Sequence, residues 1–247
     1  MRDVLLCGRK WRQGALSAIP SWHRRRAAIF QLAATLLLSS LLLGVGFVAA
    51  KPLFDQLTAV AVQRYGPPGR EAVTAWRRLL ADAAGLDEVE QVRRVNAFFN
   101  RRIQYESDDV VWHQNDYWAT PLETLGRAMG DCEDFAIAKY VSLEALGIPR
   151  SKLRLTYVRA QIGGPTSGIV QAHMILGYYP EPSADPMILD SLISEIRPAS
   201  RRPDLAPIFS FNAEGLWVAG APAVSDPTAR LSRWRDVLQR MAQEGIQ

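Results

Sequence analysis

The spacing of apolar residues changes once along the chain, near Leu153, and this change constrains the fold more than any other feature. Before it, apolar residues recur at helical spacing from 52 to 101, with Pro67 and Pro68 separating the first two predicted helices. After it, apolar and polar residues alternate over 153–158, 172–179 and 187–193, which is typical of strands. Helices followed by an antiparallel meander predict an α+β fold.

Two shorter helices are expected between these regions. Thr120 and Glu123 have the spacing of a capping box, which predicts a helix that stops at Gly130. A second helix is predicted to begin at Cys132 and to end at Gly147. The remaining elements are a hairpin over 209–218 and a closing helix over 231–241.

Cys132 is the only cysteine beyond the N-terminal segment, and it lies at the predicted start of a helix. A helix N-terminus lowers the pKa of a thiol because unpaired N–H groups and a partial positive charge face the thiolate. A thiol at such a position is a candidate nucleophile. The alternative, a buried cysteine that acts only as a small apolar side chain, has about equal weight on this evidence.

The N-terminus predicts export. Residues 1–26 carry seven basic residues against Asp3, and 27–50 contain no charged residue. This pattern indicates a cytoplasmic n-region followed by a signal peptide or transmembrane anchor, with a buried core helix as the weaker alternative. The rest of the chain, 51–247, would then be the exported domain. Because the basic excess precedes the apolar segment and leaves that domain slightly acidic, a nucleic-acid partner is disfavoured.

A thiol nucleophile requires a general base and a group that orients it. Beyond the apolar segment the only histidines are His113, in an irregular stretch, and His173, in the second predicted strand. Alternation could turn His173 toward the helix that begins at Cys132. Asp190 lies inside the third predicted strand, where a carboxylate invites a partner. Each residue taken alone also has a simpler interpretation. His173 could be an ordinary core or surface residue, and Asp190 could lie on an exposed strand face.

Three acidic residues, Asp131, Glu133 and Asp134, surround the candidate nucleophile. A carboxylate about 6 Å from the sulfur, at an effective dielectric near 20, disfavours the thiolate by roughly 3 kcal/mol. A bound hard cation reverses this effect, and clustered carboxylates are ligands that Ca²⁺ prefers. From the residues alone, acids that complement the helix dipole are the favoured interpretation, since no EF-hand spacing is present.

Several motifs together resemble the LapG family, the bacterial transglutaminase-like cysteine proteases of the periplasm (peptidase family C93). The resemblance covers most of 55–243 and implies a papain-like or transglutaminase-like core, in which the nucleophile helix packs on an antiparallel sheet. The motifs that carry it are Asp116-Tyr117-Trp118-Ala119-Thr120-Pro121, the stretch 130–140, Leu155-Thr156-Tyr157-Val158, Gln171-Ala172-His173-Met174, Leu189-Asp190 and Phe209-Ser210-Phe211-Asn212.

The resemblance implies a role for each candidate residue. Cys132 would attack the peptide carbonyl, His173 would transfer the proton, and Asp190 would orient His173. It also implies dependence on calcium, which makes Ca²⁺ the favoured interpretation of the acidic cluster. Asp131 and Glu133 occupy the matching positions, and Asp134 is a third expected ligand.

Substrate, regulation and location follow from the same resemblance. It implies cleavage of the N-terminal retention module of a large LapA-like surface adhesin at an Ala-Ala bond, with release of the adhesin and dispersal of a biofilm. A LapD-like inner-membrane receptor for cyclic di-GMP would sequester the protease. The expected location is the periplasm, with attachment to the inner membrane if segment 27–50 is not cleaved.

Some features depart from the family pattern. The connection over 161–170 is long, and Ser191 follows Asp190 where asparagine is expected. One oxyanion donor is expected to be the backbone N–H of Cys132, whereas Trp118 is a guess for the second, with simple packing favoured.

Other functions also remain open on the sequence. Because related cores also carry acyl transfer, a transglutaminase-like acyltransferase is one alternative, and a non-catalytic periplasmic binding module is another. Neither a zinc-protease helix motif nor paired cysteine spacing is present, which disfavours a zinc hydrolase.

Overall fold

A computed structural model describes residues 50–218 and 226–246 of the protein. By its contacts the chain divides into two compact units, and the described residues from Lys51 onward belong to the second, Lys51–Gln247. Within the described ranges, no helix has the length and apolar character needed to cross a membrane. The basic region 1–26 and, apart from Ala50, the predicted signal or membrane segment lie outside the described residues.

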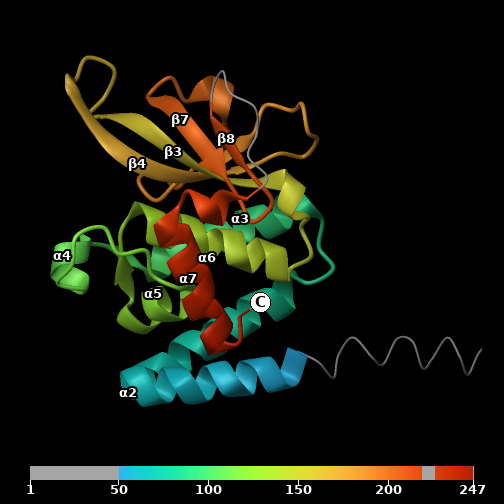
Figure 1. Ribbon diagram of the computed structural model, residues 1–247. Helices are drawn as coiled ribbons and strands as arrows, with labels where there is room; N and C mark the ends of the chain where they lie inside the picture. Colours follow the sequence, from blue (N-terminus) through green and yellow to red (C-terminus); the bar gives the residue numbers. More distant parts are fainter. Residues whose placement is uncertain (1–49, 219–225, 247) are drawn as a thin grey trace, which may run out of the picture. The chain divides into compact units, whose positions relative to one another are not determined.

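The fold is α+β, with helices packed on a six-stranded antiparallel sheet (Figure 1). The predicted α+β class is therefore confirmed. The strand order is β6-β5-β4-β3-β7-β8, so β7 returns from the far edge to pair with β3. The strands are β3 (Leu153–Ile162), β4 (Ile169–Tyr178), β5 (Met187–Leu189), β6 (Arg197–Pro198), β7 (Leu205–Phe211) and β8 (Leu216–Val218).

The strands differ in length from their predicted ranges for a simple reason. β3 and β4 form one continuous ladder of ten residue pairs, from Leu153 opposite Tyr178 to Ile162 opposite Ile169, so both extend beyond the apolar segments. β5 stops earlier, at Leu189, and Asp190 therefore lies just beyond a strand and not inside it. The predicted hairpin is present as β7 and β8.

The larger helices follow the predicted pattern. α2 is kinked at Gly66, which has a φ of 65° and precedes Pro67 and Pro68. The kink lies at the predicted boundary between two helices. The closing helix is α7, which buries Trp234, Val237 and Met241. The helices are α2 (Ala50–Ala83), α3 (Glu88–Arg102), α4 (Asp108–Val111), α5 (Pro121–Arg127), α6 (Cys132–Ala145) and α7 (Ser232–Glu244).

The capping box is present at the start of α5, but the helix ends earlier than predicted. Thr120 accepts from the Glu123 backbone N–H, and the Glu123 side chain accepts from Thr120 N–H. The helix stops at Arg127 because Ala128 adopts a left-handed conformation, φ 54°. The next two residues, Met129–Gly130, form β2 and pair in parallel with β1, Gln104–Tyr105. This short ladder therefore fixes the backbone just before Cys132.

Helix α6 is the central element of the core. Its side chains are buried on every face, including Ile137, Tyr140 and Leu143, which is expected for a helix enclosed on all sides. In Figure 1 it runs beneath the sheet between α3 and α7. Apolar residues of the sheet such as Leu155 and Leu176 belong to the same core cluster. A second, smaller cluster consists of Val158, Ala160, Ile175 and Ile188.

Candidate active site

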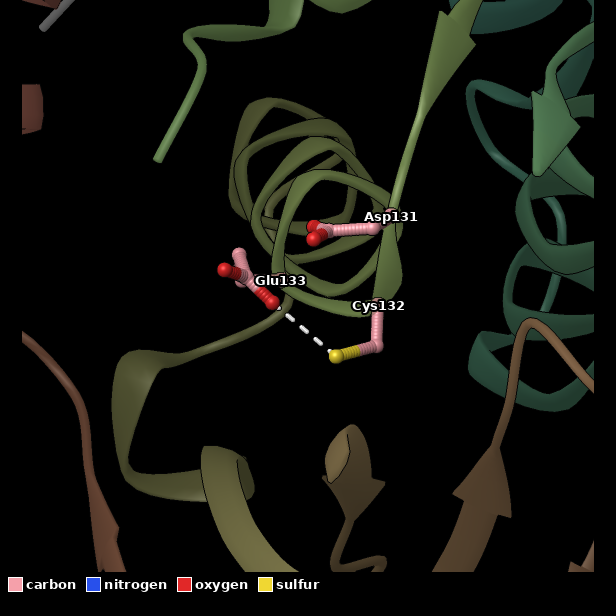
Figure 2. Close-up of side chains that lie close together, drawn as sticks. All are labelled: Asp131, Cys132 and Glu133. Carbon is pink, nitrogen blue, oxygen red and sulfur yellow. Dashed lines mark hydrogen bonds between the residues drawn. The ribbon is translucent and has the colours of Figure 1, made fainter. Parts of the chain in front are cut away.

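Cys132 is the first residue of α6 and lines a cleft of about 500 Å³ together with His173. Its thiol donates a hydrogen bond to Oε2 of Glu133, with a distance of 2.9 Å from sulfur to oxygen (Figure 2). The cleft is strongly acidic, since its lining includes no lysine or arginine and five carboxylates: Asp108, Asp109, Asp116, Asp131 and Glu133. The sulfur therefore lies at a helix N-terminus but also against negative charge.

Burial and the neighbouring carboxylates both disfavour the thiolate of Cys132. Burial raises the pKa of Cys132 far above its ordinary value, and the charge and hydrogen bond of Glu133 and the charge of Asp131 raise it further. The backbone N–H of Met174 acts in the opposite direction.

His173 and Asp190 form a buried pair. Nε2 of His173 lies 2.8 Å from Oδ1 of Asp190, and both side chains are almost completely buried. Although burial acts to raise the pKa of Asp190, hydrogen bonds from His173, Leu192 N–H and Arg202 lower it to about 2. Nδ1 of His173 is buried and meets no hydrogen-bond partner within residues 50–218 and 226–246. The second ring nitrogen is thus available for proton transfer.

The side chain of His173 does not lie on the face of β4 that packs against α6, which differs from the expected orientation. His173 lies opposite Val158 and alternates with Ile175, whose cluster is separate from the core around α6, whereas Met174 and Leu176 belong to that core. The imidazole nevertheless borders the cleft of Cys132. In the described sheet, β5 pairs with β4 only from Leu176 to Tyr178, so that edge of β4 lacks a ladder partner beside His173.

A cluster of buried carboxylates lies next to the nucleophile. One oxygen each of Asp108, Asp131 and Asp134 falls within 4.8 Å of the others. Among the described residues, Oδ1 of Asp108, Oδ1 of Asp131 and Oδ2 of Asp134 are buried without a hydrogen-bond donor. Glu133 forms two further groups of this kind, one with Asp131 and Cys132 and one with Asp108 and Asp116. These residues fit a hard cation, which takes oxygen ligands.

The electrostatics of the cluster point the same way. Burial, and then the charges of Glu133, Asp134 and Asp108, raise the pKa of Asp131 to about 10. Burial also raises the pKa of Asp108 to about 6, and that of Asp134 well above its ordinary value. Carboxylates that cannot all ionise without a counter-charge are a physical indication of a cation site.

Asp108 was missed from the sequence. It belongs to α4, only four residues long, which lies in an aromatic-rich stretch without apolar periodicity. The parallel pairing of β1 with β2 brings the segment before Asp108 beside the segment before Asp131. The one available signal was the presence of Asp108, Asp109 and Asp116 within nine residues.

Three other features singled out in the sequence lie near the site: Trp118, the connection over 161–170 and Ser191. The Trp118 indole N–H donates to Asp116 Oδ1 at 3.0 Å, and its ring stacks on Phe211, so it has a packing role. The turn between β3 and β4 lines a second cavity of about 740 Å³, which lies on the Asp190 side of His173 and is not lined by Cys132. The Ser191 hydroxyl has no partner in the described part of the chain.

Comparison with known proteins decides the family. Residues 77–203, which contain Cys132, His173 and Asp190, match the model of the bacterial transglutaminase-like cysteine proteinase BTLCP, peptidase C93. The chain belongs to the bacterial transglutaminase-like cysteine proteinases. This membership makes the protein a cysteine proteinase and confirms the predicted family and enzyme class. No match was found among curated proteins.

Solved structures of LapG support the assignment. Legionella pneumophila LapG in an EGTA-treated form is 40% identical to this chain, with a TM-score of 0.66, over 76% of this chain and 97% of that one. The calcium-bound form of Legionella LapG is 41% identical, with a TM-score of 0.64, over 76% and 98% of the two chains. The BTLCP core described above is therefore the fold of LapG.

Proposed function

We propose that this BTLCP proteinase is a calcium-dependent endopeptidase of the periplasm that cleaves the N-terminal retention module of a large LapA-like surface adhesin at an Ala-Ala bond. Cleavage releases the adhesin and promotes dispersal of a biofilm. A LapD-like inner-membrane receptor for cyclic di-GMP controls access to the protease. The similarity to LapG over 97% of its chain supports this substrate class and regulation.

The observation that carries the chemistry is the orientation of His173. With Nε2 bonded to Asp190, Nδ1 is the ring nitrogen left to accept the thiol proton of Cys132. For this transfer the thiol would have to leave its hydrogen bond to Glu133 and approach Nδ1 across the cleft that both residues line. The thiolate then attacks the scissile carbonyl, and the imidazolium returns the proton to the leaving amine. The backbone N–H of Cys132 at the start of α6 stabilises the oxyanion.

The buried carboxylate cluster supports a calcium requirement. Asp131, Glu133, Asp134 and Asp108 would hold the ion, because three of them have buried oxygens without donors in the described structure. A bound divalent cation supplies positive charge that offsets the carboxylates around the thiol. Solved structures of LapG in calcium-bound and EGTA-treated forms are consistent with a calcium site in this chain.

Export to the periplasm rests on the sequence. The positive residues of 1–26 precede an uncharged segment over 27–50, and the positive-inside rule places everything after Lys51 outside the cytoplasm. The proposed substrate and the proposed receptor would both have to be reached from that side of the inner membrane.

The test is cleavage of a defined substrate. The full-length chain in detergent micelles is incubated with the N-terminal module of a co-encoded adhesin that contains an Ala-Ala bond, with calcium or with EGTA, and the products are identified by mass spectrometry. We expect cleavage at Ala-Ala with calcium only, and its loss in Cys132→Ala and in His173→Gln. His113→Gln, which changes the exposed histidine of the same domain, is the matched control and should cleave normally.

Two results would contradict the proposal. Cleavage that continues in EGTA rejects the calcium requirement, and an intact adhesin after incubation with folded, calcium-loaded protein rejects the substrate class. Incorporation of a labelled amine into a glutamine-containing substrate would indicate acyl transfer.

A further inference from the structure

A buried arginine lies behind the His173–Asp190 pair. Nη2 of Arg202 donates to Oδ2 of Asp190 at 2.7 Å, which is the carboxylate oxygen that His173 does not use. The Arg202 side chain is only 3% exposed. Asp190 is therefore held between two cationic or potentially cationic partners, one on each oxygen.

A second carboxylate balances this arginine. Asp204 accepts from Nη2 of Arg202 at 2.7 Å and from Nε at 3.0 Å, and it is about one-third exposed. Asp190, Arg202 and Asp204 together carry one net negative charge. Protonation of His173 would bring this group to neutrality, so the balance is suited to an imidazolium that forms next to Asp190.

The backbone of Asp190 is fixed from the opposite side. Its carbonyl oxygen accepts from Nδ2 of Asn100 at 2.8 Å and from Nζ of Lys139 at 3.0 Å. Within the described residues, the Asp190 carboxylate thus accepts hydrogen bonds from His173, Leu192 N–H and Arg202. Its main chain is held by side chains of α3 and α6. Among the described residues, Arg202 is the one side chain that donates a hydrogen bond to Oδ2.

Packing alone does not explain an arginine at this place. A buried charged pair costs desolvation free energy, and an apolar side chain of similar size often gives equal or greater stability. The planar guanidinium, in contrast, fixes two carboxylates in one geometry, which an apolar side chain cannot do. The arrangement therefore indicates a role in orienting Asp190.

We propose that Arg202 is a positioning residue for the reaction, which aims Asp190 at Nε2 of His173, and that Asp204 compensates its charge so that Asp190 still acts on the imidazole as an anion. The inference rests on the roles of Cys132, His173 and Asp190 proposed above. It assigns to the segment after β6 a part in the active site that the candidate triad does not include.

The test measures the reactivity of Cys132, which needs no adhesin. The full-length chain with saturating calcium is treated with iodoacetamide at neutral pH, and alkylation of the tryptic peptide 128–139 is followed by mass spectrometry, with the Cys7 peptide as internal reference. We expect Arg202→Met to slow alkylation about tenfold, as one pKa unit of lost thiolate would. Arg202→Lys should restore part of the rate because it keeps the charge. Arg201→Met, an exposed neighbour, is the matched control.

Further variants separate the possible outcomes. Asp190→Asn should slow alkylation at least as much as Arg202→Met. If Asp190→Asn has no effect, the proposed triad fails and the role of Arg202 fails with it. If alkylation is slow in Asp190→Asn but as fast as in wild type in both Arg202→Met and Arg202→Lys, the triad stands and the role of Arg202 is refuted.

Folding is monitored by the melting temperature of each variant. If Arg202→Met does not fold, Asp204→Asn decides, because its partly exposed side chain can change without opening the core. We expect Asp204→Asn to fold and to slow alkylation about threefold, since the uncompensated Arg202 weakens the field of Asp190 at His173. A wild-type rate in both Asp204→Asn and Arg202→Lys would overturn the inference.

Discussion

Nε2 of His173 and Oδ1 of Asp190 are 2.8 Å apart and almost fully enclosed, so this bond occupies one ring nitrogen and leaves Nδ1 without a hydrogen-bond partner among the described residues. The thiol of Cys132, in contrast, donates to Glu133 and has no hydrogen bond to His173 among the described residues. The state of that thiol is therefore the first quantity that should respond to calcium.

Calcium should increase the reactivity of Cys132. Burial and the neighbouring carboxylates raise the pKa of Cys132, and a cation on those carboxylates acts against the second of these causes. We expect iodoacetamide to alkylate peptide 128–139 at least about tenfold faster with calcium than with EGTA, which corresponds to one pKa unit. Magnesium at the same concentration is the control for ionic strength. Equal rates with calcium and EGTA would rule out this coupling.

Asp108 should contribute to calcium affinity although it lies 23 positions before Asp131 in the sequence. We expect Asp108→Asn to weaken calcium binding roughly 10- to 100-fold in isothermal titration calorimetry, since affinity at such sites follows ligand charge. The rise in melting temperature on adding calcium should shrink accordingly. Asp109→Asn is the matched control, because Asp109 is exposed beside it and belongs to none of the carboxylate groups. Similar losses in both variants would argue against a specific ligand role.

Gly130 should be essential for the position of Asp134. A Cβ atom at residue 130 would lie 2.5 Å from Oδ2 and 2.8 Å from Cβ of Asp134, so Gly130→Ala must displace that carboxylate. We expect a loss of about 1–3 kcal/mol in the free energy of unfolding and weaker calcium binding, both measured on the full-length chain. Gly168→Ala, whose Cβ would meet nothing within 4 Å, should match wild type. Unchanged calcium affinity in Gly130→Ala would show that Asp134 is not a ligand.

Lys139 should make stability depend on pH. Burial lowers the pKa of Lys139 from its ordinary value of 10.5 to about 7. Below pH 7 the lysine is charged in both states and the cost of burying that charge is complete. Between pH 7 and 10.5 the unfolded chain binds the proton and the folded chain does not, so the free energy of unfolding rises with pH.

Lys139→Met tests this dependence. We expect the variant to exceed wild type in the free energy of unfolding by about 1–4 kcal/mol at pH 6, with the difference decreasing toward pH 10. Urea unfolding at a series of pH values measures it. Lys152→Met, which removes a surface partner of Glu88, is the control and should leave the slope intact. Parallel wild-type and Lys139→Met curves would contradict the prediction.

Local patterns in the sequence predicted much of this structure. The capping box of Thr120 and Glu123, the helix that begins at Cys132, and the strands β3 and β4 were each predicted from neighbouring residues along the chain, and each is present. Asp190 was singled out because it stands in an apolar stretch, although the strand ends one residue before it.

The contributions of tertiary structure could not be read in this way. Asp108 approaches Asp131 through a ladder of only two residue pairs, and so short a contact leaves no periodic pattern. Lys139 and Arg202 belong to residue types that usually lie at the surface. They are buried only because separate elements enclose them. The early end of α5 depends on a left-handed alanine, a conformation that sequence does not signal for this residue type.

The hydrogen bond from Cys132 to Glu133 also bears on how the protein survives before it acts. Oxidants such as peroxide attack the thiolate, and a nucleophile that keeps its proton reacts slowly with them. Of the residues after the apolar segment, Cys132 is the only thiol, so no neighbouring cysteine can rescue it by forming a disulfide. If Cys132 is the nucleophile, as proposed, the hydrogen bond to Glu133 would therefore also slow its oxidation while the protein is not cleaving substrate.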